Sequence, residues 1–158
     1  MSAVALPSTH LVVDASLLVA LADQDPDAAR FVPVLARSIV TSINLGEVLY
    51  KLDQRASTPP ATAEHLFTQV LGVQVDSVDL AVTRHFPELK RIDARSRAAQ
   101  TAAGIVAPKS LSLADLTCLA YAEEAGLAVL TGDRHWSTLA IHGLSVAVFD
   151  FRDPAVTP

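Results

Sequence analysis

Short apolar runs alternate along the chain with longer segments whose apolar residues recur at helical spacing. The runs predict five short strands, at residues 11–14 (LVVD), 38–42 (SIVTS), 73–76 (VQVD), 127–132 (LAVLTG) and 145–151 (SVAVFDF). The intervening patterns predict helices at about 16–22, 25–37, 43–54, 61–71, 77–103 with a break at Pro87, 113–126, and a short one after Asp133. Alternating strands and helices predict an α/β fold with a mainly parallel central sheet of about five strands, flanked by helices on both faces.

Composition narrows the class of protein. The chain has 158 residues, 51% of them apolar, which suits one domain with a sizeable core. We expect residues 1–158 to form a single domain, with an N-terminal extension at 1–10 and a short flexible tail at 153–158. The apolar run near the N-terminus has no basic segment before it and is interrupted at Asp14, so we expect no membrane segment. A single cysteine, Cys118, excludes an internal disulfide and a multi-cysteine zinc site, and favours a cytoplasmic location.

The charge balance limits how the chain can bind a polyanion. A formal net charge of −5 has the wrong sign for holding nucleic acid by bulk electrostatics alone. Basic residues are nevertheless concentrated in one predicted helical stretch, which holds five of the twelve Lys and Arg: Arg84, Lys90, Arg91, Arg95 and Arg97. This stretch has two interpretations, a solvated helix face or an RNA path.

Four acidic residues occupy comparable positions at the ends of predicted elements. Asp14 ends the first strand and Asp133 follows the fourth, while Glu47 lies one turn into the helix after the second strand. Asp115 is in the first turn of the helix that leads into the fourth strand. Because parallel strands place their carboxyl ends at one edge of a sheet, we expect these carboxylates to converge in one cleft.

Each acid also has a simpler structural explanation. Asp115 lies three residues after Ser112, as in a helix capping box, and Glu47 has Lys51 at i+4, as in a surface ion pair. Asp133 is placed to cap the short helix after it. Asp14 resists such an explanation, because it ends an apolar strand where an unpaired carboxylate is costly.

Taken together, the four acids point to a metal centre. Carboxylates gathered in one cleft repel one another and raise each other's pKa unless cations neutralise them. All-oxygen ligands without paired cysteines suit one or two Mg²⁺ or Mn²⁺ ions better than zinc. A pair of such ions about 4 Å apart can activate water against a phosphodiester and stabilise the leaving oxygen. Metal ions would also grip a phosphate that this acidic chain does not attract by itself.

Three segments, LVVDASLLVALA, TSINLGEVLYKL and LSLADLTCLAYAEEAGLAVLTGDRHW, together resemble a PIN-domain ribonuclease, specifically the small VapC-type toxins of type II toxin–antitoxin systems. The resemblance covers nearly the whole chain. It implies a metal-dependent endoribonuclease whose acidic quartet, Asp14, Glu47, Asp115 and Asp133, binds Mg²⁺ or Mn²⁺ and cleaves RNA. The sequence departs from many family members just after Asp133, where Arg134 and His135 replace a further acid or polar residue.

The resemblance also assigns supporting roles. Ser16 and Asn44 are similar to the family's supporting polar positions. Helix capping explains Ser16 equally well, and Asn44 would fix Glu47 or satisfy the start of its helix. Arg134 is a candidate RNA contact, although a solvated arginine is the simpler explanation. His135 is not needed as a base, and Trp136 is expected to pack in the core.

Partners follow from the same resemblance. It implies an RNA substrate, with tRNA or rRNA as candidate targets, a small VapB-type antitoxin protein, and a homodimer. The apolar helices around LLVALA (17–22) and VLYKL (48–52) offer the antitoxin a surface, but sequence alone does not separate that surface from core.

Two other classes of protein compete with the nuclease. A receiver-like signalling domain also uses acids at strand ends, Mg²⁺ and a lysine, for which Lys109 is available, but Asp76 would have to accept the phosphoryl group. A catalytically silent binding module would have acids that only cap helices. A haloacid-dehalogenase-type phosphatase would need a second Asp two residues after Asp14, where this chain has Ser16.

Overall fold

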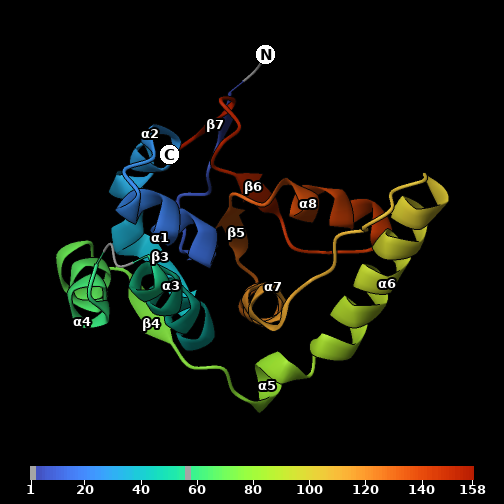
Figure 1. Cartoon of the computed structure of the whole chain (residues 1–158), viewed down its shortest axis with the longest axis horizontal. Coiled ribbons are helices and arrows are strands. Elements are labelled where there is room, and N and C mark those ends of the chain that lie inside the picture. The colour runs from blue at the N-terminus through green and yellow to red at the C-terminus, as the bar shows by residue number, and fades with distance from the viewer. Residues whose placement is uncertain (1–2, 56–57) are drawn as a thin grey trace.

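A computed structural model describes residues 3–55 and 58–158 (Figure 1). Its main sheet has five parallel strands in the order β4-β3-β2-β5-β6, and a second, small parallel sheet pairs β1 with β7. The strands are β1 (Val4–Ala5), β2 (Leu11–Val13), β3 (Ser38–Thr41), β4 (Gln74–Asp76), β5 (Ala128–Thr131), β6 (Val148–Asp150) and β7 (Val156–Thr157).

Helices cover both faces of the main sheet. They are α1 (Ala15–Ala22), α2 (Pro26–Ala29), α3 (Ser42–Gln54), α4 (Pro60–His65), α5 (Leu80–Thr83), α6 (Phe86–Ala102), α7 (Leu113–Ala125) and α8 (Arg134–Ser137). In Figure 1, α1 to α4 lie on one side of the strands and α5 to α8 on the other. The core is accordingly divided, since Leu11 and Val13 of β2 join one apolar cluster and Val12 joins the other. The predicted parallel α/β fold is confirmed.

Strand order decides which acids meet. β2 occupies the centre of the sheet, with β3 on one side and β5 on the other. Asp14 follows β2 directly, and Asp133 follows β5 after the single residue Gly132. Helix α3 begins at the end of β3 and carries Glu47 past the same edge. The carboxyl ends of three adjacent strands therefore form one functional edge.

Several helix boundaries differ from the prediction. The helix expected at 25–37 is α2 followed by a 3₁₀ segment, Val32–Arg37, because Pro33 has no N–H for an α-helical hydrogen bond. The helix expected at 61–71 is α4 followed by a π-helical turn, Leu66–Val70. The break expected at Pro87 falls just before it, and Pro87 lies in the first turn of α6, where a proline is tolerated.

The expected flexible tail at 153–158 is instead held against the domain. Its strand β7 pairs with β1, and Val156 is only 5% exposed. Arg30, the C-cap residue of α2, holds this region, since its guanidinium donates to the carbonyls of Phe151 at 2.9 Å and Val156 at 3.4 Å. A sequence pattern does not show such long-range contacts, so the pairing of β7 with β1 was not predicted.

The apolar helices considered as a partner surface lie largely in the core. Leu17 and Leu18 of α1 are completely buried, as are Val48 and Leu52 of α3. In the VLYKL segment, Tyr50 is the large exposed side chain, at 64%. In the described part of the chain, no helix combines the length and apolar character that crossing a bilayer requires.

Candidate active site

The four predicted acids gather at the functional edge of the sheet. The charge of Asp115 on α7 raises the pKa of Asp14, and the charges of Glu47 and Asp133 in turn raise the pKa of Asp115. Such mutual influence requires that the carboxylates lie within electrostatic range of one another. Two strands and two helices far apart in the sequence thus contribute to one acidic cluster.

Asp14 is buried in a cage of polar donors. It is 5% exposed, and its Oδ2 accepts hydrogen bonds from the Ser16 hydroxyl at 2.6 Å and the Thr131 hydroxyl at 3.0 Å. The backbone N–H of Ser16 donates to the same oxygen at 3.2 Å, which makes Asp14 the N-cap of α1. The Asn44 side-chain amide donates to Oδ1 at 3.4 Å. These four hydrogen bonds fix both carboxylate oxygens in place.

The environment of Asp14 disfavours its charge. Burial is the main cause that raises the pKa of Asp14, and repulsion from Asp115 adds to it. The hydrogen bonds from Ser16 and Thr131 act in the opposite direction without cancelling the rise. No Lys or Arg in the described residues forms an ion pair with Asp14. A buried carboxylate without a cationic partner is a favourable position for an added cation.

Asp115 combines a structural role with a place in the cluster. It completes the predicted capping box, because Ser112 N–H donates to its Oδ2 at 2.8 Å and its own N–H donates to Ser112 Oγ at 3.1 Å. Burial is again the largest cause that raises its pKa, ahead of the charges of Glu47 and Asp133. The capping explanation is therefore correct but incomplete.

The other two acids are paired with lysines. Glu47 contacts Lys51 on the next turn of α3 at 2.6 Å, as the simpler explanation predicted. Asp133 caps α8 through the N–H of His135 at 2.9 Å, and its Oδ1 also contacts Lys109 Nζ at 3.1 Å. No group of three His, Cys, Asp or Glu lies close enough to hold a metal ion within residues 3–55 and 58–158.

The two supporting residues have defined contacts. Ser16 donates to Asp14 and accepts the N–H of Gly132 at 2.9 Å, so it joins the ends of β2 and β5. It does not cap α1, because Asp14 does. Asn44 lies against Asp14 and accepts a hydrogen bond from the Thr41 hydroxyl at 2.6 Å, so it holds Asp14 and not Glu47.

Three residues near the cluster are packed in the core. Cys118 is fully buried, and burial with the nearby acids raises the pKa of its thiol well above the ordinary value, so it is inert as a nucleophile. Burial lowers the pKa of His135, which disfavours its charged form. Trp136, which belongs to α8, is 1% exposed and packs in the core, as predicted.

Three residues of the site escaped the sequence analysis. Thr131 was read only as part of a strand, yet it is completely buried and bridges Asp14 and the Asp133 N–H. A polar residue as the last member of an apolar strand was the available signal. Gly132 and Arg152 meet across the functional edge, where Arg152 Nη1 donates to the Gly132 carbonyl at 3.2 Å. No local pattern indicated this contact, because the two residues follow different strands, β5 and β6.

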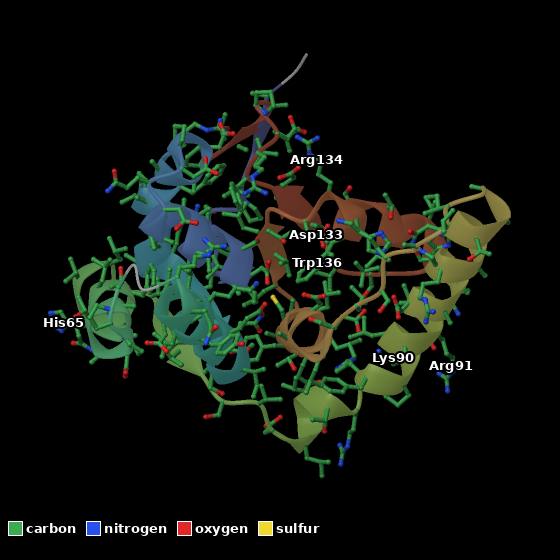
Figure 2. The ribbon with its side chains drawn as sticks, in the orientation of Figure 1. His65, Lys90, Arg91, Asp133, Arg134 and Trp136 are labelled. Atoms are coloured by element: carbon green, nitrogen blue, oxygen red, sulfur yellow. The ribbon has the colours of Figure 1, made fainter. Side chains whose placement is uncertain are left out.

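The basic stretch on α6 is largely occupied by internal contacts. Arg91 and Arg95 both pair with Glu88, at 2.8 and 3.0 Å, and Lys90 donates to the Leu111 carbonyl at 3.4 Å. In Figure 2, Arg91 projects outward from α6, whereas Asp133 lies near the centre of the molecule. These contacts favour the solvated helix face over a continuous RNA path.

The protein is therefore an α/β domain whose parallel sheet is covered by helices on both faces. An acidic cluster lies at the carboxyl ends of its central strands. The family model of the PIN domain matches residues 11–141. The chain belongs to the PIN domain family, which confirms the resemblance to PIN-domain proteins noted in the sequence. A search of curated proteins found no match to the sequence.

Solved structures share the fold at low sequence identity. DNA-bound VapBC from Salmonella typhimurium is 16% identical, with a TM-score of 0.60, and the match covers 90% of this chain and 98% of that one. VapBC2 from Rickettsia felis, bound to a promoter DNA fragment, is 13% identical, with a TM-score of 0.64 and the same coverage. Mycobacterium tuberculosis VapC20, a toxin that cleaves the sarcin-ricin loop, is 20% identical, with a TM-score of 0.59, and the match covers 85% of this chain and 95% of that one.

Proposed function

We propose that this protein is a metal-dependent endoribonuclease, the toxin of a VapBC-type toxin–antitoxin pair. The observation that carries the proposal is Asp14, a caged and buried carboxylate that has no cationic partner among the described residues and is repelled by Asp115. Such a group is expensive in the folded protein and is retained where it binds a cation. A receiver-like function is disfavoured, because Asp76 lies on the edge strand β4 and accepts a hydrogen bond from Tyr121.

The donor set suits a divalent metal ion. Asp14, Asp115, Glu47 and Asp133 offer carboxylate oxygens only, the ligands that Mg²⁺ and Mn²⁺ prefer. Lys51 and Lys109 pair with Glu47 and Asp133, so positive charge already lies beside two of the four acids. When bound, one or two such ions would supply a polarised water and stabilise the leaving oxygen of a phosphodiester. Ser16, Asn44 and Thr131 would keep Asp14 oriented throughout.

Substrate and partners complete the proposal. The PIN family and the VapC neighbours favour RNA as the substrate, with tRNA or rRNA as candidate targets. The VapBC structures favour a small VapB-type antitoxin as a partner. A homodimer is proposed from the family resemblance alone. Cytoplasmic RNA is the expected target, and Arg134, whose side chain is 78% exposed, is a proposed contact for its backbone.

The proposal is tested by cleavage of a mixed structured RNA pool with Mg²⁺ or Mn²⁺. Wild type should cut, EDTA should stop it, and Asp14→Asn and Asp115→Asn should each lose at least about 100-fold in rate, since each removes a ligand charge. Mn²⁺ binding measured by calorimetry should weaken in the same two variants.

Ser112→Ala is the matched control for the helix cap. It removes the hydroxyl that accepts the Asp115 N–H but leaves the carboxylate, so it should cost about 1 kcal/mol of stability and retain cleavage. Folding of each variant is checked by circular dichroism. Absence of both cutting and Mn²⁺ binding in folded wild type would refute the nuclease and favour the silent binding module.

A further inference from the structure

A surface pocket of about 340 Å³ adjoins the acidic cluster, and three of its six lining residues are basic. Its walls are formed by Ser16, Gly132, Asp133 and three basic residues, Lys109, Arg134 and Arg152. Each of the three cations has a carboxylate neighbour: Asp133 lies 3.1 Å from Lys109, Asp150 lies 3.4 Å from Arg134, and Asp25 lies 3.7 Å from Arg152. All three side chains nevertheless remain exposed, so each keeps N–H donors available to a ligand. The three basic residues come from the α6–α7 loop, the start of α8 and the segment after β6, so only the tertiary structure brings them together.

Arg152 is fixed in this wall by three contacts. Nη1 donates to the Gly132 carbonyl at 3.2 Å, Nη2 lies 3.7 Å from Asp25 Oδ2, and the guanidinium carbon stacks 4.9 Å from the Phe151 ring centre. The glycine is necessary for this arrangement. A Cβ at position 132 would lie 2.6 Å from the Phe151 ring and 3.1 Å from Arg152 Nη1. With its side chain 41% exposed, Arg152 still presents donors to solvent.

Lys109 is held in position by α6. The Gln100 side chain clamps its backbone, accepting the Lys109 N–H at 2.9 Å and donating to its carbonyl at 3.3 Å. Two residues later, the Leu111 N–H donates to the buried carboxylate of Asp93 at 3.0 Å. This double attachment fixes the loop, while the Lys109 side chain remains 63% exposed and reaches Asp133. The ammonium group is therefore placed at the pocket, although its exposed ion pair contributes little stability.

We propose that Lys109, Arg134 and Arg152 form a subsite for a phosphate of the RNA chain, next to the phosphate that is cleaved. This inference rests on the proposed ribonuclease function. Arginine forks and a lysine ammonium are the groups that bind phosphate oxygens in proteins. The subsite gives an acidic protein the local cations that its net charge does not provide, and it orients the RNA chain past the acidic cluster.

The experiment measures RNA binding without cleavage. A fluorescein-labelled single-stranded RNA of 12 nucleotides is titrated with protein in EDTA, and anisotropy gives Kd between 25 and 200 mM NaCl. Lys109→Met and Arg152→Gln keep most of the side-chain stem while removing the charge. Each should raise Kd several-fold, and each should reduce the slope of log Kd against log salt by about 0.7, the value for one phosphate contact on a single strand.

Arg97→Gln is the matched control, because it removes one exposed cation from α6 outside the pocket. The subsite is supported if Arg97→Gln keeps the wild-type Kd and salt slope while the pocket variants have a higher Kd and a smaller slope. The subsite is overturned if the pocket variants bind like wild type, or if Arg97→Gln weakens binding equally. It is also overturned if the pocket variants lose affinity only for a glutamate-rich peptide, which would assign the cations to a protein partner.

The two proposals fail in different ways. If wild type cleaves RNA with metal but the pocket variants bind and respond to salt as wild type does, only the subsite is wrong. If the pocket variants lose affinity while wild type never cleaves with Mg²⁺ or Mn²⁺, the subsite stands and the nuclease is wrong. A wild type that neither cleaves nor binds RNA refutes both.

Discussion

Replacing Thr131 by valine tests whether the hydrogen bonds around Asp14 stabilise the folded protein as a coupled group. Valine has nearly the same shape, so it leaves no cavity in this completely buried position. It removes the hydroxyl that donates to Asp14 Oδ2 at 3.0 Å and accepts the Asp133 N–H at 3.1 Å. Asp14 then stays buried with one hydrogen-bond donor fewer.

The expected cost follows from these two hydrogen bonds. A hydrogen bond to a charged group contributes about 1.5 to 3 kcal/mol and a neutral one about 0.5 to 1.5 kcal/mol. We therefore expect Thr131→Val to lower the free energy of unfolding by about 2 to 4 kcal/mol at pH 7. For a domain of this size, that corresponds to a fall in Tm of roughly 5 to 15 °C.

Urea denaturation followed by the fluorescence of Trp136, the only tryptophan, measures the change. Thr117→Val is the matched control, because Thr117 is also buried but donates only to the Leu113 carbonyl within its own helix. It should cost about 1 kcal/mol or less. In an Asp14→Asn background the cost of Thr131→Val should fall by about 1 kcal/mol or more, since the charged acceptor is gone. The reasoning would be refuted if the two valine variants lost equal free energy of unfolding. It would also be refuted if Thr131→Val cost as much in the Asp14→Asn background as in wild type.

Two further predictions concern the same edge. Because the pKa of Asp14 is raised in the folded protein above its ordinary 3.8, the native state binds more protons than the unfolded state, and wild-type stability falls as pH rises from near 3.8 through the folded pKa. In EDTA, Asp14→Asn should therefore unfold at higher urea than wild type at neutral pH, and the difference should shrink toward pH 3; a pH-independent difference would contradict this account. Gly132→Ala should lower the free energy of unfolding by about 1 to 3 kcal/mol and weaken RNA binding, because its Cβ meets the Phe151 ring at 2.6 Å. Wild-type urea and anisotropy curves for this variant would show that the edge tolerates a side chain.

Local patterns in the sequence determined the elements and the order of the acids along the chain. Continuous apolar runs predict β2, β3 and β5, because strands of a buried parallel sheet are apolar on both faces. Asp14 lies at the end of one such run. The capping-box pattern of Ser112 and Asp115 predicts the start of α7. These features depend on neighbours within a few residues, so the sequence alone expresses them.

Contacts between distant residues were decided by the tertiary structure. Asp14 is surrounded by hydrogen-bond donors because Thr131 and Asn44 contact it only once β5 and α3 have packed beside β2. The segment at 153–158 contacts Arg30 and pairs with β1, partners that no local pattern contains. Lys109 and Arg152 joined the site in the same way, through Gln100 and Gly132. Periodicity records which side of an element faces the core, whereas these contacts depend on strand order and packing, which a local pattern does not encode.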